Sequence, residues 1–254
     1  MNQYPEKIYL NDLVLRIISY PILGRAIKNH IYPAEAYPFW DKVFPGFKMP
    51  CRDLFAEDVT PIIKKAFHDK ISKCFIKNRE QFIAKFTGWP RIGFLQKIFP
   101  DAKFIHIKRD GRAVANSLFN YRLWNGWYGP ESWRWGSLSD DFALLWDQFQ
   151  RSFLILAAIQ WVILEQAFMA AIEKSKNNSV LSIKYENLCS NPLGVLKQIV
   201  EFCGLDWSQK FESRIKEHKI YDANKKWKTG LSKKQKKDLQ DFLKGYLDQF
   251  GYKT

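Results

Sequence analysis

An arginine and a serine eight residues apart are the first side chains in this sequence whose spacing suits the binding of an anion. Arg109 follows the apolar run 104–107, and Ser117 lies two turns into a segment with apolar residues at helical spacing. This pattern predicts a short buried strand, a tight turn and a helix start. The carboxyl end of a parallel strand beside a helix N-terminus is where α/β proteins hold anions, so a guanidinium and a hydroxyl there predict a phosphate site. The alternative is that Arg109 pairs with Asp110 or Asp101.

The elements that must position these side chains alternate along the chain, and strands alternating with helices predict a parallel sheet flanked by helices. Thr60 is a predicted N-cap, with Pro61 in the first helical position. Asn191-Pro192 is predicted to start a helix that Gly204 ends, and Ser232 is predicted to cap the last helix. Strands are predicted at 81–86, 104–107 and 180–185, and 73–77 is either a short strand or the end of the preceding helix. Helices are predicted at 9–30 (kinked by a proline), 60–72, 91–99, 112–120, 140–174 (broken near 151), 191–203 and 231–246; 32–50 and 121–136 are predicted loops.

Length and charge narrow the class of protein. The 254 residues, 46% of them apolar, suffice for a single α/β domain over 1–254, although two domains are possible. A net charge of +14 suits a polyanionic ligand, a nucleic acid or an anionic surface. Much of this charge is local, because residues 209–237 hold eleven lysines or arginines against three acids.

Cysteine and hydropathy patterns indicate a reduced, cytoplasmic protein. The four cysteines form no CxxC pair and no histidine is spaced for zinc, so we expect free thiols and no metal. The first 25 residues lack the pattern of a signal peptide. The most apolar window, 153–172, is interrupted by Gln160, Glu165 and Gln166, which favours a buried core helix over a membrane span.

The segment KFIHIKRDGRAVANS resembles the 3′-phosphate-binding segment of sulfotransferases that use 3′-phosphoadenosine 5′-phosphosulfate (PAPS). In that family an arginine at a strand end and a serine eight residues later hold the 3′-phosphate, and Arg109 and Ser117 have this spacing. The likeness runs from about Glu35 to the C-terminus. It implies a P-loop-related α/β fold and metal-independent transfer of a sulfuryl group from PAPS to an acceptor hydroxyl or amine.

The resemblance also implies two catalytic residues. Lys85 stands where the Lys-Thr-His motif of cytosolic sulfotransferases has the lysine that steadies the leaving phosphate; by itself it would be a surface lysine at a strand end. Thr87 stands in place of the histidine, and a hydroxyl is no general base near neutral pH. Glycan and tyrosylprotein sulfotransferases use a glutamate, which makes Glu35 the candidate base, partly desolvated by neighbouring aromatic residues. Asp41 is the nearest alternative.

Two further segments resemble nucleotide-binding parts of the family. KYENLC is similar to its Tyr-Glu-Asp/Asn-Leu segment, which implies that Tyr185 lies near the adenine; otherwise it is a core tyrosine at a strand end. NKKWKTGL is similar to its C-terminal basic loop. That likeness implies that Lys226, Trp227 and Lys228 contact the 3′-phosphate and the adenine. The alternative is a solvated, lysine-rich linker.

The tryptophan-rich stretch 121–136 has two interpretations. Planar aromatic faces bind sugar rings and apolar groups, so Trp124 and Trp127 are candidates for binding a small-molecule or glycan acceptor. Alternatively, the stretch fills the core.

One part of the family pattern has no counterpart here. Sulfotransferases carry an N-terminal strand and a phosphate loop of glycine and small hydroxyl residues, and none of the thirteen glycines fits such a loop. The sequence therefore predicts an N-terminally incomplete sulfotransferase that cannot place the sulfuryl group by itself. Two alternatives remain: a relative that only binds 3′-phosphoadenosine nucleotides, and a basic nucleic-acid-binding protein. The nucleic-acid-binding protein ranks last among these possibilities, because the lysines cluster in a stretch that the resemblance already explains. We therefore expect no nucleic-acid partner.

Overall fold

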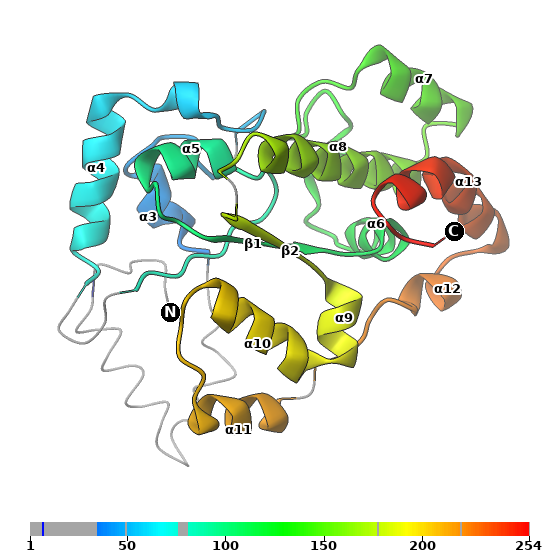
Figure 1. Ribbon diagram of the computed structural model, residues 1–254. Helices are drawn as coiled ribbons and strands as arrows, with labels where there is room; N and C mark the ends of the chain where they lie inside the picture. The colour runs from blue at the N-terminus through cyan, green and yellow to red at the C-terminus, as the bar shows by residue number, and fades with distance from the viewer. Residues whose placement is uncertain are drawn as a thin grey trace. The chain divides into compact units, whose positions relative to one another are not determined.

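The computed structural model describes Lys7 and residues 35–48, 50–75, 81–176, 178–218 and 220–253. The chain divides into two compact units, residues 1–100 and 101–254 (Figure 1). The helix predicted at 9–30 lies outside the described residues. The expectation that the family's N-terminal strand and phosphate loop are missing also concerns residues outside this range, and it stays a prediction. The prediction of one domain over 1–254 stays a prediction.

Helices packed on an aromatic core form the described part of the first unit. Its elements are α3 (Tyr37–Asp41), the 3-10 helix η1 (Ala56–Asp58), α4 (Pro61–Ser72) and α5 (Ile92–Ile98). The predicted start of α4 is confirmed, because the Thr60 hydroxyl accepts a hydrogen bond from the Ile63 amide at 3.2 Å. Rings from the loops and from α3, α4 and α5 pack together, among them Phe39, Trp40, Phe47, Phe67 and Phe94, all buried.

Two predictions for this unit are wrong. The loop predicted at 32–50 contains the short helix α3. Residues 81–86 form no strand, and Lys85 therefore does not lie at a strand end. The physical reason is the lack of a partner: a strand needs a neighbour for its backbone groups, and 81–86 pairs with no strand of the described residues. Ile83 is 86% exposed, so the apolar side chain at this position does not pack against the rest of the unit.

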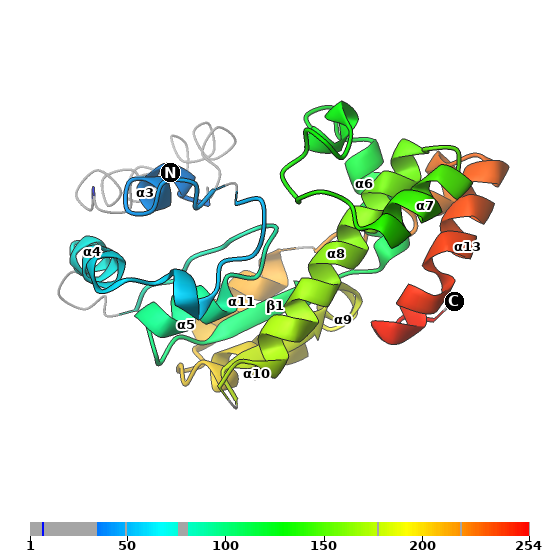
Figure 2. The ribbon, with the colours of Figure 1, turned by 90° about the horizontal axis from the view of Figure 1, so that it is seen from above.

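A parallel pair of strands is the centre of the second unit. β1 (Phe104–Lys108) pairs with β2 (Val180–Lys184) in the register Phe104 to Val180 through Lys108 to Lys184. Helices flank the pair in both views (Figures 1 and 2), which confirms the predicted α/β class with a parallel sheet. The helices are α6 (Gly111–Phe119), α7 (Asp140–Gln148), α8 (Phe153–Glu173), α9 (Tyr185–Ser190), α10 (Pro192–Phe202), α11 (Gln209–Glu217), α12 (Lys226–Gly230) and α13 (Lys233–Gln249).

The longest of the described helices, α8, packs along α6 and supplies much of the core of this unit. It is long and apolar enough to cross a membrane by length and composition, but 56% of its most apolar window is buried inside the unit, as expected of a core helix. The predicted break before α8 is confirmed. Gln150 and Arg151 there have φ angles of 55° and 52°, and this left-handed backbone ends one helix before the next begins.

Caps that the sequence predicts also bound the last helices. The Asn191 side chain accepts from the Gly194 amide at 3.0 Å at the start of α10, and Gly204 follows its end with φ 66°. Ser232 caps α13, reciprocally with Gln235. The loop predicted at 121–136 contains only a single 3-10 turn, η2 (Asn125–Tyr128). The sequence missed α9, α11 and α12.

Candidate functional site

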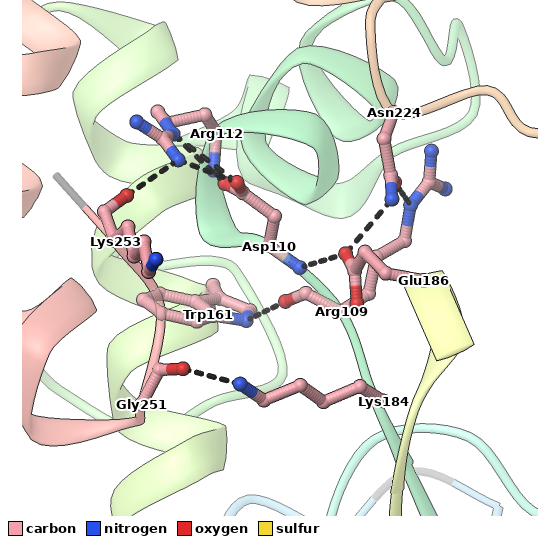
Figure 3. A network of polar contacts seen from close by, with 9 residues as sticks. All are labelled: Arg109, Asp110, Arg112, Trp161, Lys184, Glu186, Asn224, Gly251 and Lys253. Carbon is pink, nitrogen blue, oxygen red and sulfur yellow. Dashed lines mark hydrogen bonds and ion pairs between the residues drawn. The ribbon is translucent and has the colours of Figure 1, made fainter. Parts of the chain in front are cut away.

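The turn between β1 and α6 presents Arg109 and is fixed by its neighbours (Figure 3). The Asp110 carboxylate caps α6 by accepting from the Arg112 amide at 2.8 Å. The indole N–H of Trp161 donates to the Arg109 carbonyl at 3.1 Å. A Cβ on Gly111 would lie 2.5 Å from the Trp161 ring, so only glycine allows this close approach. The turn is therefore held rigidly at the carboxyl end of β1.

Arg109 is held by a network of polar groups rather than by a nearby acid. Its Nε donates to Asn224 Oδ1 at 2.7 Å, and its guanidinium lies 4.7 Å from the centre of the Tyr185 ring. Asn224 Nδ2 in turn donates to Glu186 Oε1 at 2.8 Å. Asp110, the alternative partner considered for Arg109, instead pairs with Arg112 at 2.7 Å.

A pocket of about 370 Å³ opens beside this network. It has three cationic and two carboxylate side chains, and of the predicted site residues Trp227 and Lys228 line it. The lining residues are Asp110, Arg112, Glu186, Asn224, Lys225, Trp227, Lys228 and Gln240.

The other predicted nucleotide-binding residues lie outside the lining of this pocket. Ser117 is exposed further along α6, in the same helix as Arg112. Lys226 Nζ lies 5.3 Å from the centre of the Tyr221 ring. Tyr185 directly follows β2, as predicted, and its hydroxyl donates to the Tyr221 carbonyl at 2.8 Å.

Trp227 is mainly a packing residue of the basic loop. Its side chain is 6% exposed, and the Arg112 guanidinium lies 5.2 Å from its ring centre, with Lys228 Nζ at 5.8 Å. Little of the indole face is therefore free to stack on an adenine. Its position fixes α12 against the start of α6 and so sets where the lysines of the loop lie.

Sequence reasoning missed several residues of this site: Arg112, Glu186, Asn224, Lys225 and Gln240. Four of them stand inside or beside the segments that the resemblance singled out, namely RDGR, KYENLC and NKKWKTGL. Only the fold shows that Asn224, and not just the lysines after it, faces Arg109.

In the first unit the two predicted catalytic side chains meet. Lys85 Nζ lies 2.9 Å from Glu35 Oε1, with the lysine side chain 75% exposed and the glutamate 23% exposed. The Thr87 hydroxyl donates to the other carboxylate oxygen, Oε2, at 3.3 Å, although the two residues are 52 apart in sequence. The Tyr37 hydroxyl accepts from the Thr87 amide at 3.1 Å. A carboxylate, an ammonium and two hydroxyls thus form one cluster.

A buried arginine supports the loop that follows Lys85. The Arg91 guanidinium is 1% exposed and donates to the carbonyls of Trp89 at 2.7 Å, Phe47 at 3.0 Å and Thr87 at 3.3 Å. Asp53 accepts from the Arg91 amide at 2.7 Å, and burial raises the pKa of Asp53 to about 6. Asp41, the rival candidate base, accepts from the Lys48 amide at 2.8 Å instead.

The two tryptophans predicted to bind an acceptor lie in different surroundings. Trp124 is 4% exposed, and its indole N–H donates to the buried Gln160 side chain at 2.6 Å, which makes it part of the core. Trp127 is 37% exposed. It lines an open depression of about 500 Å³ together with Phe119, Asn120, Arg122 and Tyr128. Within the described residues, no group of three or more His, Cys, Asp or Glu side chains could hold a metal ion.

Comparisons with known proteins point to one family. A family model described as "Sulfotransferase family" matches residues 40–209, more than half of the chain. No curated protein matches the sequence. Two solved structures are similar: the sulfotransferase domain from the curacin biosynthetic pathway (14% identity, 75% of this chain and 68% of that one, TM-score 0.47) and mouse sulfotransferase SULT7A1 complexed with PAP (15% identity, 85% and 81%, TM-score 0.43).

Proposed function

Because this chain belongs to the sulfotransferase family, we propose that it transfers a sulfuryl group from PAPS to an acceptor hydroxyl or amine, leaving adenosine 3′,5′-bisphosphate. One observation carries the choice of donor. Arg109 is fixed at the end of β1 through Nε, while its two terminal nitrogens have no hydrogen bond to the described residues. A guanidinium held in this way offers two parallel N–H donors to a phosphate.

The nucleotide half of the proposal uses the second unit. Arg109 and Ser117 hold the 3′-phosphate, and Lys228 adds positive charge from the adjoining pocket. Tyr185 lies against the Arg109 guanidinium and is proposed to border the adenine. Trp227 is proposed to support this arrangement through its buried indole rather than by stacking on the base. Lys226 is proposed to contribute to the long-range attraction of the anionic donor.

The chemical step is assigned to the cluster in the first unit. The acceptor oxygen or nitrogen attacks sulfur, the bond from sulfur to the bridging oxygen of the 5′-phosphate breaks, and the acceptor proton passes to the Glu35 carboxylate. Lys85 stabilises the charge that develops on the leaving phosphate. Its ion pair with Glu35 is exposed, and such pairs contribute roughly 0–1 kcal/mol, so the lysine is readily released to a phosphate oxygen.

The position of Glu35 compensates for the absent histidine. Thr87 stands where the cytosolic enzymes have that histidine, and its hydroxyl donates to Glu35 Oε2. The carboxylate therefore lies beside the position that the family's base would occupy. The bond from Thr87 also restricts its rotation, and a general base must be held in place to act.

The acceptor is proposed to be a small molecule or a glycan bound at the aromatic depression. Trp127 and Tyr128 supply ring faces there, and Arg122 supplies a cation. Trp124 contributes indirectly, because its buried ring packs edge-on against Trp127 with the ring centres 5.4 Å apart.

A nucleotide titration tests the donor. We expect the wild type to bind adenosine 3′,5′-bisphosphate more tightly than adenosine 5′-monophosphate by calorimetry, and Arg109→Ala to remove that preference. Hydrogen bonds to charged groups contribute about 1.5–3 kcal/mol, so the loss is roughly ten- to a hundredfold. Arg214→Ala, an exposed arginine on α11, is the matched control. Equal affinity for both nucleotides, or salt-dependent binding of generic RNA without nucleotide preference, contradicts the proposal.

Turnover with labelled PAPS and a panel of small phenols, amines and saccharides tests the chemistry. Glu35→Gln and Lys85→Met are expected to abolish sulfuryl transfer while nucleotide affinity stays within about twofold of wild type. Lys97→Met, an exposed lysine on α5, controls for loss of positive charge. Nucleotide binding without turnover of any acceptor favours a relative that only binds the nucleotide.

A further inference from the structure

We propose that Asn224, oriented by Glu186, is a positioning residue that aims the Arg109 guanidinium at the 3′-phosphate of the bound nucleotide. This inference rests on the proposed function, because it assigns a purpose to the direction in which Arg109 points. It concerns two residues that belong to neither the catalytic cluster nor the basic side chains of the site.

The orientation of the Asn224 amide is determined by its two neighbours. A guanidinium can only donate hydrogen bonds and an ionised carboxylate can only accept them. Asn224 lies between one of each: Arg109 Nε donates to its Oδ1 at 2.7 Å, and its Nδ2 donates to Glu186 Oε1 at 2.8 Å. Rotating the amide by half a turn would place donor against donor and acceptor against acceptor. Only one orientation satisfies both neighbours.

Glu186 is itself anchored to the turn that carries Arg109. The same carboxylate oxygen accepts from the Asp110 backbone amide at 3.1 Å (Figure 3). The main chain of Asn224 is fixed as well, because its backbone N–H donates to Asp222 Oδ1 at 2.9 Å. The turn after β1, the start of α9 and the segment before α12 are therefore joined through one carboxylate and one amide.

The consequence for Arg109 is a fixed direction with its binding edge left open. Asn224 engages Nε, and the Tyr185 ring lies against the guanidinium at 4.7 Å. The two terminal nitrogens of Arg109, which bind phosphate most effectively as a pair, have no hydrogen bond to the part of the chain that the structure describes (Figure 3). Without Asn224 the side chain would have to give up rotamer freedom when the nucleotide binds, and affinity would fall.

Glutamine in place of Glu186 provides a conservative variant. Oε1 alone accepts both hydrogen bonds, while Oε2 is buried without a hydrogen-bond partner among the described residues. A glutamine can place its single amide oxygen at the position of Oε1, so Glu186→Gln is expected to retain most of the wild-type affinity for the bisphosphate. Alanine at this position frees the Asn224 amide to turn, and its effect should resemble that of Asn224→Ala.

Calorimetry with adenosine 3′,5′-bisphosphate and adenosine 5′-monophosphate tests the proposal. We expect Asn224→Ala and Glu186→Ala each to weaken bisphosphate binding about tenfold and to leave monophosphate binding unchanged. The double variant Arg109→Ala with Asn224→Ala should bind no more weakly than Arg109→Ala alone, because Asn224 acts through Arg109. Asn187→Ala, which removes an exposed amide side chain of α9 outside the lining of this pocket, is the control and should bind like the wild type.

The outcomes separate this inference from the proposed function. If Arg109→Ala removes the preference for the bisphosphate but Asn224→Ala behaves like the wild type, the inference fails and the proposed function stands. Additive losses in the double variant also overturn it, because they would mean that Asn224 contacts the nucleotide directly. If neither alanine variant folds, as judged by urea unfolding, the network serves folding and the inference is wrong. If the wild type shows no preference, the proposed function itself fails.

Discussion

The strand that presents Arg109 carries a buried histidine that lies beside a buried glutamate, and this pair should contribute to how stability depends on pH. His106 of β1 is 7% exposed, and its ring stacks on Phe168 at 3.9 Å. Its Nε2 lies 3.7 Å from Oε2 of Glu165, which is also 7% exposed. Burial raises the pKa of Glu165 from 4.5 to about 7 and lowers the pKa of His106 from 6.5 to about 4. The positive charge of Lys108 lowers both pKa values.

The two pKa shifts change the free energy of unfolding in opposite directions as pH rises. Between pH 4.5 and 7 folded Glu165 keeps a proton that the unfolded chain has lost, so its contribution falls as pH rises. Between pH 6.5 and 4 unfolded His106 binds a proton that the folded chain does not, so its contribution falls as pH drops. Each shift corresponds to about 3 kcal/mol at 1.36 kcal/mol per pKa unit. Between pH 4.5 and 6.5 the two pH dependences have opposite signs and cancel, and in this range the pair lowers the free energy of unfolding least.

Glu165→Gln isolates the acid, because it keeps the size of the side chain and removes its ionisation. Relative to the wild type, the variant should gain up to about 3 kcal/mol of unfolding free energy between pH 5 and pH 8. Urea unfolding followed by circular dichroism at half-unit pH steps measures this difference. Glu173→Gln, exposed at the end of the same helix, is the control and should follow the wild-type curve. Parallel curves for Glu165→Gln and the wild type would refute the reasoning.

Three further predictions concern packing around the site. Gly111→Ala places a Cβ 2.5 Å from the Trp161 ring, so we expect the free energy of unfolding in urea to fall by about 1–3 kcal/mol and nucleotide binding to weaken. An unchanged urea midpoint contradicts the close approach. Arg91→Met removes the hydrogen bonds of one guanidinium to three carbonyl groups, at about 1.5–3 kcal/mol for each hydrogen bond to a charged group, and turnover should fall with stability. A variant as stable as the wild type would show that those bonds contribute nothing. Removing residues 250–254 deletes the carbonyls that accept hydrogen bonds from Lys108, Lys184 and Arg112, so affinity for the bisphosphate should drop. Removing Thr254 alone is the control and should have no effect. Equal affinity of the two shortened chains argues against a role for this tail.

Local sequence signals predicted those parts of the fold that local chemistry decides. Thr60 with Pro61, Asn191 with Pro192, and Ser232 each satisfy backbone amides that a helix start leaves unpaired, and all three caps are formed. β1 was predicted because the run 104–107 is followed by a turn and a helix start, and its position is confirmed. In these places propensity and tertiary structure agree. The expected burial of β1 is wrong, because Ile105 and Ile107 are 38% and 52% exposed.

The errors arise where tertiary context decides. Residues 81–86 have the composition of a strand, but composition does not supply a neighbouring strand. The five-residue helix α3 begins after Ala36, whose φ of 52° is unfavourable for alanine, so the burial of Phe39 and Trp40 stabilises it rather than local preference. α12 is also only five residues long and contains two lysines, and the burial of Trp227 decides its position.

In the candidate site, too, local sequence decides some features and tertiary structure decides others. The identity of Arg109 follows from its neighbours in sequence, because a strand, a turn and a helix start are all local. Its direction does not, since it depends on an amide 115 residues away that is in turn oriented by a carboxylate 38 residues before it. Neither Asn224 nor Glu186 carries the charge that would mark it as a ligand for an anion. Cationic side chains are the sequence signal of a phosphate site, whereas the neutral and acidic groups that give those cations their geometry carry no such signal.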